Sequence, residues 1–330
     1  MHVRSWSRAL TTGCLLLLGL FCALSPPRLW AAPPNLATPP GGAPIPAVFD
    51  GVRRVVAIGD IHGDYEKFSA VLQLCGVTDA GLRWIAGPTH VVQTGDVLDR
   101  GPDSKKVMDA LRQLEDQAQR AGGRVHALIG NHEFMTMVGD LRYVSDGELA
   151  AFGDGPRGTP VGREPLGQFP KYRAAFTKEG PYGRWILSHN AIVRVNGTLF
   201  MHGGISPRYM NRNIVELNDL VRAELRGERD ARVGVGADPE GPLWFRGLAE
   251  TLPPQALDSF LAQMLPVQGA RRIVMGHTIQ EGGISLRAGE RIALIDVGMS
   301  RQTINGAPSC LIIEPDPAKA GVDRLTIRRP

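Results

Sequence analysis

The sequence lacks both an apolar run long enough to cross a membrane and a large excess of charge. The apolar run Ala9–Leu24 spans 16 residues, whereas a membrane-spanning helix needs about 20. With 40 Gly and 25 Pro in 330 residues, these two types stay below the share of about 25–30% that indicates low-complexity disorder. The formal net charge is +4, and no clustered basic stripe suggests a groove for nucleic acid. A polytopic membrane protein, a collagen and a coiled coil are therefore excluded.

The first 32 residues have the layout of a secretory signal peptide. Two arginines precede the apolar run, which ends at Ser25-Pro26-Pro27, and the small residues Ala31-Ala32 follow. An uncleaved membrane anchor is the alternative, which the short run disfavours. We expect secretion, cleavage near Ala32 and no stable membrane span afterwards. Cleavage removes three arginines and no acidic residue, so 34 basic residues remain against 33 acidic ones, a net charge of +1.

Cysteine is scarce in the chain, which contains four. Two of them, Cys14 and Cys22, lie in the predicted signal peptide, so Cys75 and Cys310 are the mature pair. Two cysteines can form a disulfide in an oxidising compartment, but their separation in the sequence carries no geometric information. We interpret Cys75 and Cys310 as two buried thiols.

Residues 33–50 are rich in proline, glycine and alanine, which predicts an extended linker before an ordered domain over residues 51–330. Within that domain, apolar spacings of three and four predict helices at 64–74, 104–121 and 254–265. Asn196-Gly197 between two apolar runs predicts a tight hairpin. Residues 136–184 show no clear periodicity, and we expect a cap-like or loop insertion there.

One local pattern recurs five times: a short apolar run ends at glycine or histidine, next to a polar residue able to bind a ligand. The runs lead to Asp60, Asp96, Asn131-His132, His202 and His277. Short apolar runs of this kind predict buried strands. In layered α/β folds, ligands bind at the carboxyl ends of such strands. We therefore expect these five strands to place their polar residues along one rim.

Three dense motifs contain most of these residues. They are Gly59-Asp60-Ile61-His62-Gly63, Gly95-Asp96-Val97-Leu98-Asp99-Arg100-Gly101 and Gly130-Asn131-His132-Glu133. Carboxylate, imidazole and amide oxygen suit Mn, Fe or Zn better than copper-thiolate chemistry. A single Gly-Asp pair indicates only a turn, but three such motifs in order are difficult to obtain by chance.

These three motifs resemble those of the metal-dependent phosphoprotein phosphatases, which are GDxHG, GDxxDRG and GNHE. Val97-Leu98 differs from the Tyr-Val of eukaryotic Ser/Thr members, and their SAPNY-type loop is absent. The runs 202–207 (HGGISP) and 241–246 (GPLWFR) are similar to those of the Shewanella-like branch. The resemblance implies an α/β, calcineurin-like metallophosphoesterase fold with a central β-sandwich flanked by helices. It also implies a periplasmic location for the secreted protein.

The resemblance further implies a role for each motif residue. The first metal would be bound by Asp60, His62 and Asp96, and the second by Asp96, Asn131, His202 and His277. Asp96 would bridge the two ions, which are divalent or trivalent, with manganese foremost and iron or zinc as alternatives. His132 would be the general acid, oriented by Asp99, while Arg100 and Arg246 would bind the phosphate.

The resulting expectation is hydrolysis of phosphomonoesters by direct attack of a metal-bridging hydroxide. The substrate would be a phosphorylated protein, with phosphotyrosine and also phosphoserine or phosphothreonine accepted, or a small phosphomonoester. A dinucleoside-polyphosphate hydrolase is the alternative enzyme, because such enzymes use the same motifs. A catalytically inactive phosphate-binding module is disfavoured, since the ligand set is complete. A cysteine-dependent route is also disfavoured, because neither mature cysteine begins a CxxxxxR loop.

Several other polar and aromatic residues receive structural roles. We expect His90, His126 and His189 to be structural or surface histidines, and Trp185 and Trp244 to lie in the core. Glu133 is expected to hold backbone rather than metal. Asp296 is expected either to support a ligand or to hold a turn.

Overall fold

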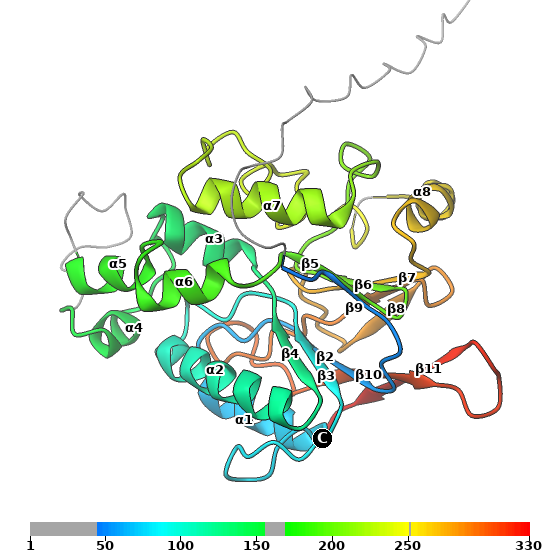
Figure 1. Cartoon of the computed structure of the whole chain (residues 1–330), viewed down its shortest axis with the longest axis horizontal. Coiled ribbons are helices and arrows are strands. Elements are labelled where there is room, and N and C mark those ends of the chain that lie inside the picture. The colour runs from blue at the N-terminus through cyan, green and yellow to red at the C-terminus, as the bar shows by residue number, and fades with distance from the viewer. Residues whose placement is uncertain (1–44, 156–168, 251) are drawn as a thin grey trace, which may run out of the picture. The chain divides into compact units, whose positions relative to one another are not determined.

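The computed structural model describes residues 45–155, 169–250 and 252–330, which Figure 1 shows in colour. The predicted signal peptide and residues 33–44 of the predicted linker lie outside the described residues, as does part of the expected insertion. Within the described ranges, no helix is both long and apolar enough to cross a membrane.

Two sheets form the centre of the domain. The five-stranded sheet has the order β11-β10-β2-β3-β4, and the six-stranded sheet has the order β1-β5-β6-β7-β9-β8. Strands β2, β3 and β4 run parallel, as do β6, β7 and β9. The first sheet consists of β2 (Val55–Ile58), β3 (His90–Gln93), β4 (Arg124–Ala127), β10 (Cys310–Pro315) and β11 (Asp323–Arg328). The second consists of β1 (Val48–Phe49), β5 (Ile192–Val195), β6 (Thr198–Met201), β7 (Arg272–Met275), β8 (Ser285–Arg287) and β9 (Ile292–Leu294).

The two sheets pack face to face. Side chains alternate along each strand, so every second side chain lies between the sheets and the others face the helices. In β2, Val55 and Ala57 enter an apolar layer that also contains Phe200 and Val274 of the other sheet. The intervening Val56 and Ile58 instead join the apolar cluster that contains the helices. The predicted β-sandwich flanked by helices is therefore confirmed.

Helices cover both outer faces of the sandwich (Figure 1). On one side lie α1 (Tyr65–Leu74) and α2 (Ser104–Arg120), and on the other α7 (Ile214–Leu225) and α8 (Pro254–Val267). The three predicted helices appear as α1, α2 and α8, with ends shifted by at most two residues. Asp64 caps α1 by accepting the Lys67 N–H at 3.2 Å, whereas the Asp103 carboxylate before α2 binds the Lys106 ammonium at 2.7 Å instead.

The segment 136–184, expected to be a cap-like or loop insertion, contains short helices in its described part. After the end of α3 (Asn131–Val138), its described part contains α4 (Asp146–Ala151) and α5 (Pro170–Phe176), and α6 (Pro181–Leu187) begins within it. These three helices have only six or seven residues, too few to show a 3.6-residue period in the sequence. Packing of aromatic rings stabilises them, since Phe152 lies 5.0–5.3 Å from the rings of Tyr172, Phe176 and Tyr182.

The end of the predicted linker also belongs to the domain. Strand β1 pairs in parallel with β5, and the Arg194 N–H donates to the Ala47 carbonyl at 2.7 Å. The predicted hairpin between β5 and β6 is confirmed. Asn196 and Gly197 adopt φ values of 49° and 77°, the left-handed pair that a tight hairpin turn requires.

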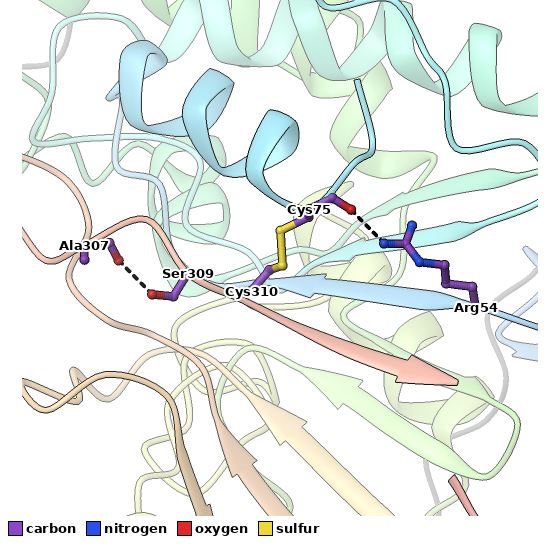
Figure 2. Close-up of a disulfide and its surroundings, with 5 residues drawn as sticks. All are labelled: Arg54, Cys75, Ala307, Ser309 and Cys310. Atoms are coloured by element: carbon purple, nitrogen blue, oxygen red, sulfur yellow. Dashed lines mark hydrogen bonds between the residues drawn. A yellow bond between two sulfur atoms is a disulfide. The ribbon is translucent and has the colours of Figure 1, made fainter. Parts of the chain in front are cut away.

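Cys75 and Cys310 form a disulfide (Figure 2), so the interpretation as two free thiols is wrong. Cys75 follows the last residue of α1, and Cys310 begins β10, where it lies opposite Ile58 of β2. The two Cα atoms are 6.7 Å apart although 235 residues separate them in the sequence. The two cysteines meet only because β10 pairs with β2, and no local sequence pattern predicts that pairing.

Replacing both cysteines by serine is expected to destabilise the fold by about 2–5 kcal/mol, because the disulfide closes a long loop in the unfolded chain. Urea unfolding of the oxidised protein and the double variant measures this difference. Equal unfolding midpoints and slopes would show that the cross-link contributes nothing to stability.

Candidate metal centre

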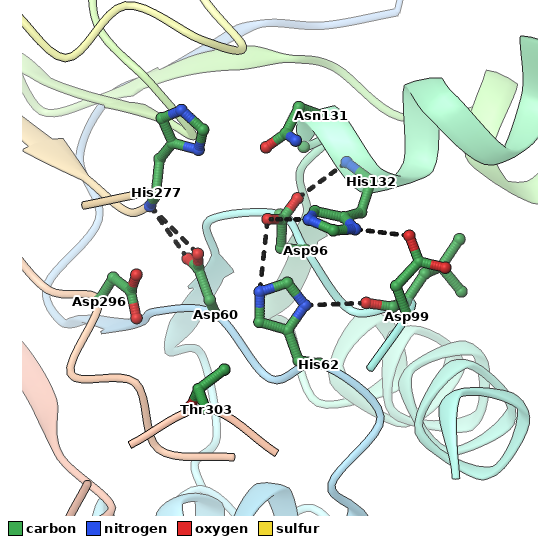
Figure 3. A network of polar contacts seen from close by, with 12 residues as sticks. Asp60, His62, Asp96, Asp99, Asn131, His132, His277, Asp296 and Thr303 are labelled. Carbon is green, nitrogen blue, oxygen red and sulfur yellow. Dashed lines mark hydrogen bonds and ion pairs between the residues drawn. The ribbon is translucent and has the colours of Figure 1, made fainter. Parts of the chain in front are cut away.

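The six predicted metal ligands lie together and are buried, each at most 7% exposed. They come from the carboxyl ends of five strands in both sheets, because β2, β3 and β4 end at the same rim as β6 and β7. Figure 3 shows five of these ligands, Asp60, His62, Asp96, Asn131 and His277, gathered in one place. The ligands are Asp60 and His62 after β2, Asp96 after β3, Asn131 at the start of α3, His202 after β6 and His277 after β7.

Asp96 lies at the centre of the cluster. Its Oδ2 atom is 3.2 Å from His202 Nε2 and 3.7 Å from the Nε2 atoms of both His62 and His132. Asp96 also belongs to two buried sets of closely spaced donors, one with His62 and His132 and one with His202 and His277. Burial alone would raise the pKa of Asp96, but the imidazoles of His202 and His132 hold it well below its usual value.

The other carboxylate, Asp60, interacts with Asp296. Burial and the charges of Asp296 and Asp96 raise the pKa of Asp60 well above its usual value. The backbone N–H of His277 donates to Asp60 at 3.2 Å, while Asp296 accepts the Gly298 N–H at 2.8 Å. Asp296 thus both holds a turn and contacts a predicted ligand, which combines the two expected roles.

The donor set fits cations. Several carboxylates are crowded in a buried space, and His277 Nε2 is buried with no hydrogen-bond partner among the described residues. Such groups are costly to bury unless a positive charge or a bond compensates them. Imidazole, carboxylate and amide donors without thiolate suit manganese, iron or zinc.

Backbone carbonyls orient two of the histidines. The Nδ1 atoms of His62 and His202 lie 3.0 Å from the carbonyl oxygens of Leu98 and Thr94. A proton on each Nδ1 leaves the Nε2 lone pair directed into the cluster, which is the form that binds metal. Burial also lowers the pKa of His62 to about 3. The ring therefore stays neutral at physiological pH.

Glu133 holds the loop after β3, as predicted. Its carboxylate accepts backbone N–H groups from Gly130 and Asp96 at 2.8 Å, and from Val97 and Leu98 at 2.8 and 3.2 Å. Four donors leave this carboxylate little capacity for a metal ion. They also stabilise Asp96 in its left-handed conformation, with φ at 59°.

Two motif glycines provide space for the carboxylates. A Cβ atom on Gly130 would lie 2.3 Å from Asp96 Oδ1, and one on Gly276 would lie 2.4 Å from Asp60 Oδ1. Both distances are shorter than atomic contacts allow. The glycines before Asn131 and His277 are therefore required by close approach to the cluster.

His132 and Asp99 form a buried pair beside the cluster. His132 Nδ1 lies 2.5 Å from Asp99 Oδ2, and the other ring nitrogen faces Asp96 (Figure 3). Burial alone would lower the pKa of His132, but the charges of Asp96 and Asp99 raise it to about 9. The ring thus has the fixed orientation of a proton donor.

The two predicted phosphate-binding arginines lie at the edge of the site. Both side chains are exposed. The Arg246 guanidinium donates to the His277 carbonyl, and the Arg100 guanidinium lies 5.1 Å from the ring of Tyr143. The Tyr143 ring is in turn 5.1 Å from the ring of His132. Tyr143 was not predicted as a site residue, because it lies in the segment 136–184 without a motif around it.

A groove of about 1050 Å³ adjoins the cluster. Phe134, Val138 and Trp244 provide apolar surface, while Arg246 and His277 connect the groove to the cluster. The prediction that Trp244 lies in the core is therefore only partly right. Its ring is half-buried, and its Nε1–H donates to the Gly236 carbonyl at 2.8 Å. Trp185 is buried, as expected.

The three remaining histidines have structural contacts, as predicted. His126 Nε2 lies 3.1 Å from His90 Nδ1, and His189 Nε2 lies 2.9 Å from a Glu115 carboxylate oxygen. None of the three belongs to either donor set found among the described residues.

Comparison with known proteins assigns the family. Residues 53–281 match the model of the calcineurin-like phosphoesterases. The Shewanella-like protein phosphatase 2 of Arabidopsis thaliana is 33% identical over 302 residues, covering 81% of this chain and 77% of the relative. The Shewanella-like protein phosphatase 1 of Plasmodium berghei is 27% identical, covering 85% and 77%.

A solved structure agrees with this assignment. The crystal structure of the cold-active protein-tyrosine phosphatase of a psychrophilic Shewanella species has a TM-score of 0.68 at 31% identity, and the match covers 82% of this chain and 77% of that one. The chain therefore belongs to the calcineurin-like phosphoesterases and, among them, to the Shewanella-like protein phosphatases.

Proposed function

We propose that this chain is a metal-dependent protein phosphatase that hydrolyses phosphomonoesters with two bound metal ions. The observation that carries the proposal is the position of Asp96, shared by two buried donor sets and flanked by the His132–Asp99 pair. The proposed ligands are Asp60, His62 and Asp96 for one ion, and Asp96, Asn131, His202 and His277 for the other. When bound, the ions would supply Lewis-acid stabilisation of phosphate charge and lower the pKa of water.

The protein residues have separate tasks in this reaction. Hydrolysis forms a bond between phosphorus and an oxygen from water and breaks the bond between phosphorus and the leaving-group oxygen, which gains a proton as it departs. His132 Nε2 is proposed to donate that proton, while Asp99 holds the opposite nitrogen of the ring. Arg100 and Arg246 are proposed to bind the phosphate oxygens from the edge of the site.

Phosphotyrosine is the substrate that the groove favours, with phosphoserine and phosphothreonine also accepted. A phosphorylated tyrosine places an aromatic ring next to the phosphate, and Phe134 and Trp244 offer apolar surface beside the cluster. The cold-active Shewanella relative is described as a protein tyrosine phosphatase, which supports the same preference.

A substrate panel on the purified protein tests the proposal. Phosphotyrosine and phosphoserine peptides of the same sequence are compared with diadenosine tetraphosphate, each after addition of manganese, iron or zinc. We expect the protein to hydrolyse the phosphopeptides, fastest with manganese, and we expect a metal chelator to abolish this activity. Faster cleavage of the dinucleotide would favour the polyphosphate hydrolase, and no turnover with any metal would favour an inactive module.

Secretion to a periplasm is proposed together with this activity. The Cys75–Cys310 disulfide supports it, because such bonds persist in oxidising compartments. N-terminal sequencing of the mature protein is expected to begin near residue 33. Retention of Met1 in the purified protein would refute cleavage.

Arg246 provides a test of phosphate binding. Arg246→Ala is expected to lower kcat/KM by about 10²-fold, since one donor to the developing phosphate charge is lost. Arg246→Lys should restore little of the lost kcat/KM, because lysine lacks the planar, two-pronged guanidinium of arginine. Arg83→Ala, which removes an exposed arginine paired with Asp79, is the matched control and should behave as wild type. Unchanged kinetics of Arg246→Ala would remove this residue from the phosphate site.

A further inference from the structure

A buried carboxylate lies behind the His132–Asp99 pair and belongs to none of the sequence motifs. Glu148 of α4 is fully buried. Its Oε2 atom accepts the backbone N–H of Asp99 at 3.1 Å, and its Oε1 atom accepts the hydroxyl of Tyr172 at 2.8 Å. Tyr172, on α5, is also fully buried.

The backbone that Glu148 contacts is strained. Asp99 and Arg100 both have left-handed conformations, with φ values of 69° and 67°. Each such residue other than glycine costs about 1–3 kcal/mol and persists only where its surroundings hold it. The Asp99 N–H binds Glu148, and the Arg100 N–H donates to the Tyr143 carbonyl at 2.9 Å. Both anchors come from the segment 136–184.

This turn determines where the Asp99 carboxylate lies. Asp99 Oδ2 holds His132 Nδ1 at 2.5 Å, so a displaced turn would release the ring. A buried carboxylate is costly unless hydrogen bonds compensate it, and Glu148 accepts hydrogen bonds from the turn and from Tyr172. The bonds thus run from Tyr172 through Glu148 and the Asp99 turn to His132.

We propose that Glu148, held by Tyr172, is a positioning residue for proton donation by His132. It contacts no substrate and acts through Asp99. The inference rests on the proposed function, in which His132 protonates the leaving group. It adds that α4 and α5 of the segment 136–184, which carry Glu148 and Tyr172, are needed for that proton transfer.

The test compares leaving groups. Glu148→Ala is expected to lower kcat by about 10–100-fold for phenyl phosphate, which needs protonation of its leaving group, because small misplacements of a catalytic group have effects of this size. For p-nitrophenyl phosphate the loss should stay below about 3-fold, since this leaving group departs without a proton. KM and metal content should remain within about 2-fold of wild type.

Conservative variants separate positioning from general damage to the fold. Glu148→Gln should regain most activity, because its amide oxygen can accept the Asp99 N–H and its amide nitrogen can donate to Tyr172. Tyr172→Phe is expected to lower kcat for phenyl phosphate by about 3–10-fold. Tyr182→Phe is the matched control, since Tyr182 is also a buried residue but its hydroxyl binds Asp109 at 2.7 Å, and this variant should be unaffected.

A double-mutant cycle decides the route of the effect. In a His132→Asn background, Glu148→Ala and Tyr172→Phe should each change kcat by less than about 3-fold, because the residue through which they act is gone. A full loss in that background, or equal losses for both aryl phosphates, would overturn the proposal. If Glu148→Ala does not fold, the Tyr172→Phe cycle gives the decision. Failure of the wild-type protein to hydrolyse either ester would instead refute the proposed function.

Discussion

Replacing His132 by asparagine is expected to lower kcat by about 10²–10⁴-fold while leaving the metal content near that of the wild type. The substitution keeps all six proposed ligands and removes only the proposed proton donor. It also removes the bond to Asp99, whose carboxylate is buried. The loss should shrink for p-nitrophenyl phosphate, because a good leaving group needs little protonation. Kinetics with two aryl phosphates and metal analysis measure both expectations.

A second histidine gives the control for this variant. His189→Asn removes a half-buried histidine whose ring contacts Glu115 rather than the cluster. It should retain wild-type kcat with both esters. If His132→Asn loses its metals, or if its deficit is equal for both leaving groups, His132 is not the general acid.

Replacing Asp96 by asparagine is expected to reduce metal occupancy and to abolish most activity. The substitution removes the negative charge that lies within 4 Å of three imidazoles and belongs to both donor sets. Two cations close together would then repel each other with less compensation, so at least one should bind much more weakly. Metal analysis after dialysis against limiting manganese, followed by activity at increasing manganese, measures the effect.

Asp103→Asn is the matched control for this substitution. Asp103 lies next to the same loop, but its carboxylate binds Lys106 at the surface. Full metal content is expected for this variant. Two tightly bound ions and full activity in Asp96→Asn would show that the bridging role belongs to another residue.

The strands and the cluster were predictable because local signals mark them. Short apolar runs predict β2 and the other strands that lead to the cluster. The polar residue after each run lies at the carboxyl end of a strand. Parallel strands bring those ends to one rim, so Asp60, Asp96 and His277 meet although more than 200 residues separate the first from the last. The hairpin at Asn196-Gly197 was predictable for a similar reason, since its turn requires residues that tolerate positive φ.

The sequence by itself thus determined the sandwich, the residues that meet in the buried cluster, and the neighbouring His132 and Asp99, which pair beside it. Only the tertiary structure decided the Cys75–Cys310 disulfide, the short helices of the segment 136–184 and the support of Asp99 by Glu148. Periodicity and turn chemistry act over a few neighbouring residues, so they specify strands, turns and long helices. A disulfide between α1 and β10, or a carboxylate that reaches a strained turn 49 residues away, depends on how those elements pack, because the contact exists only after the chain has folded.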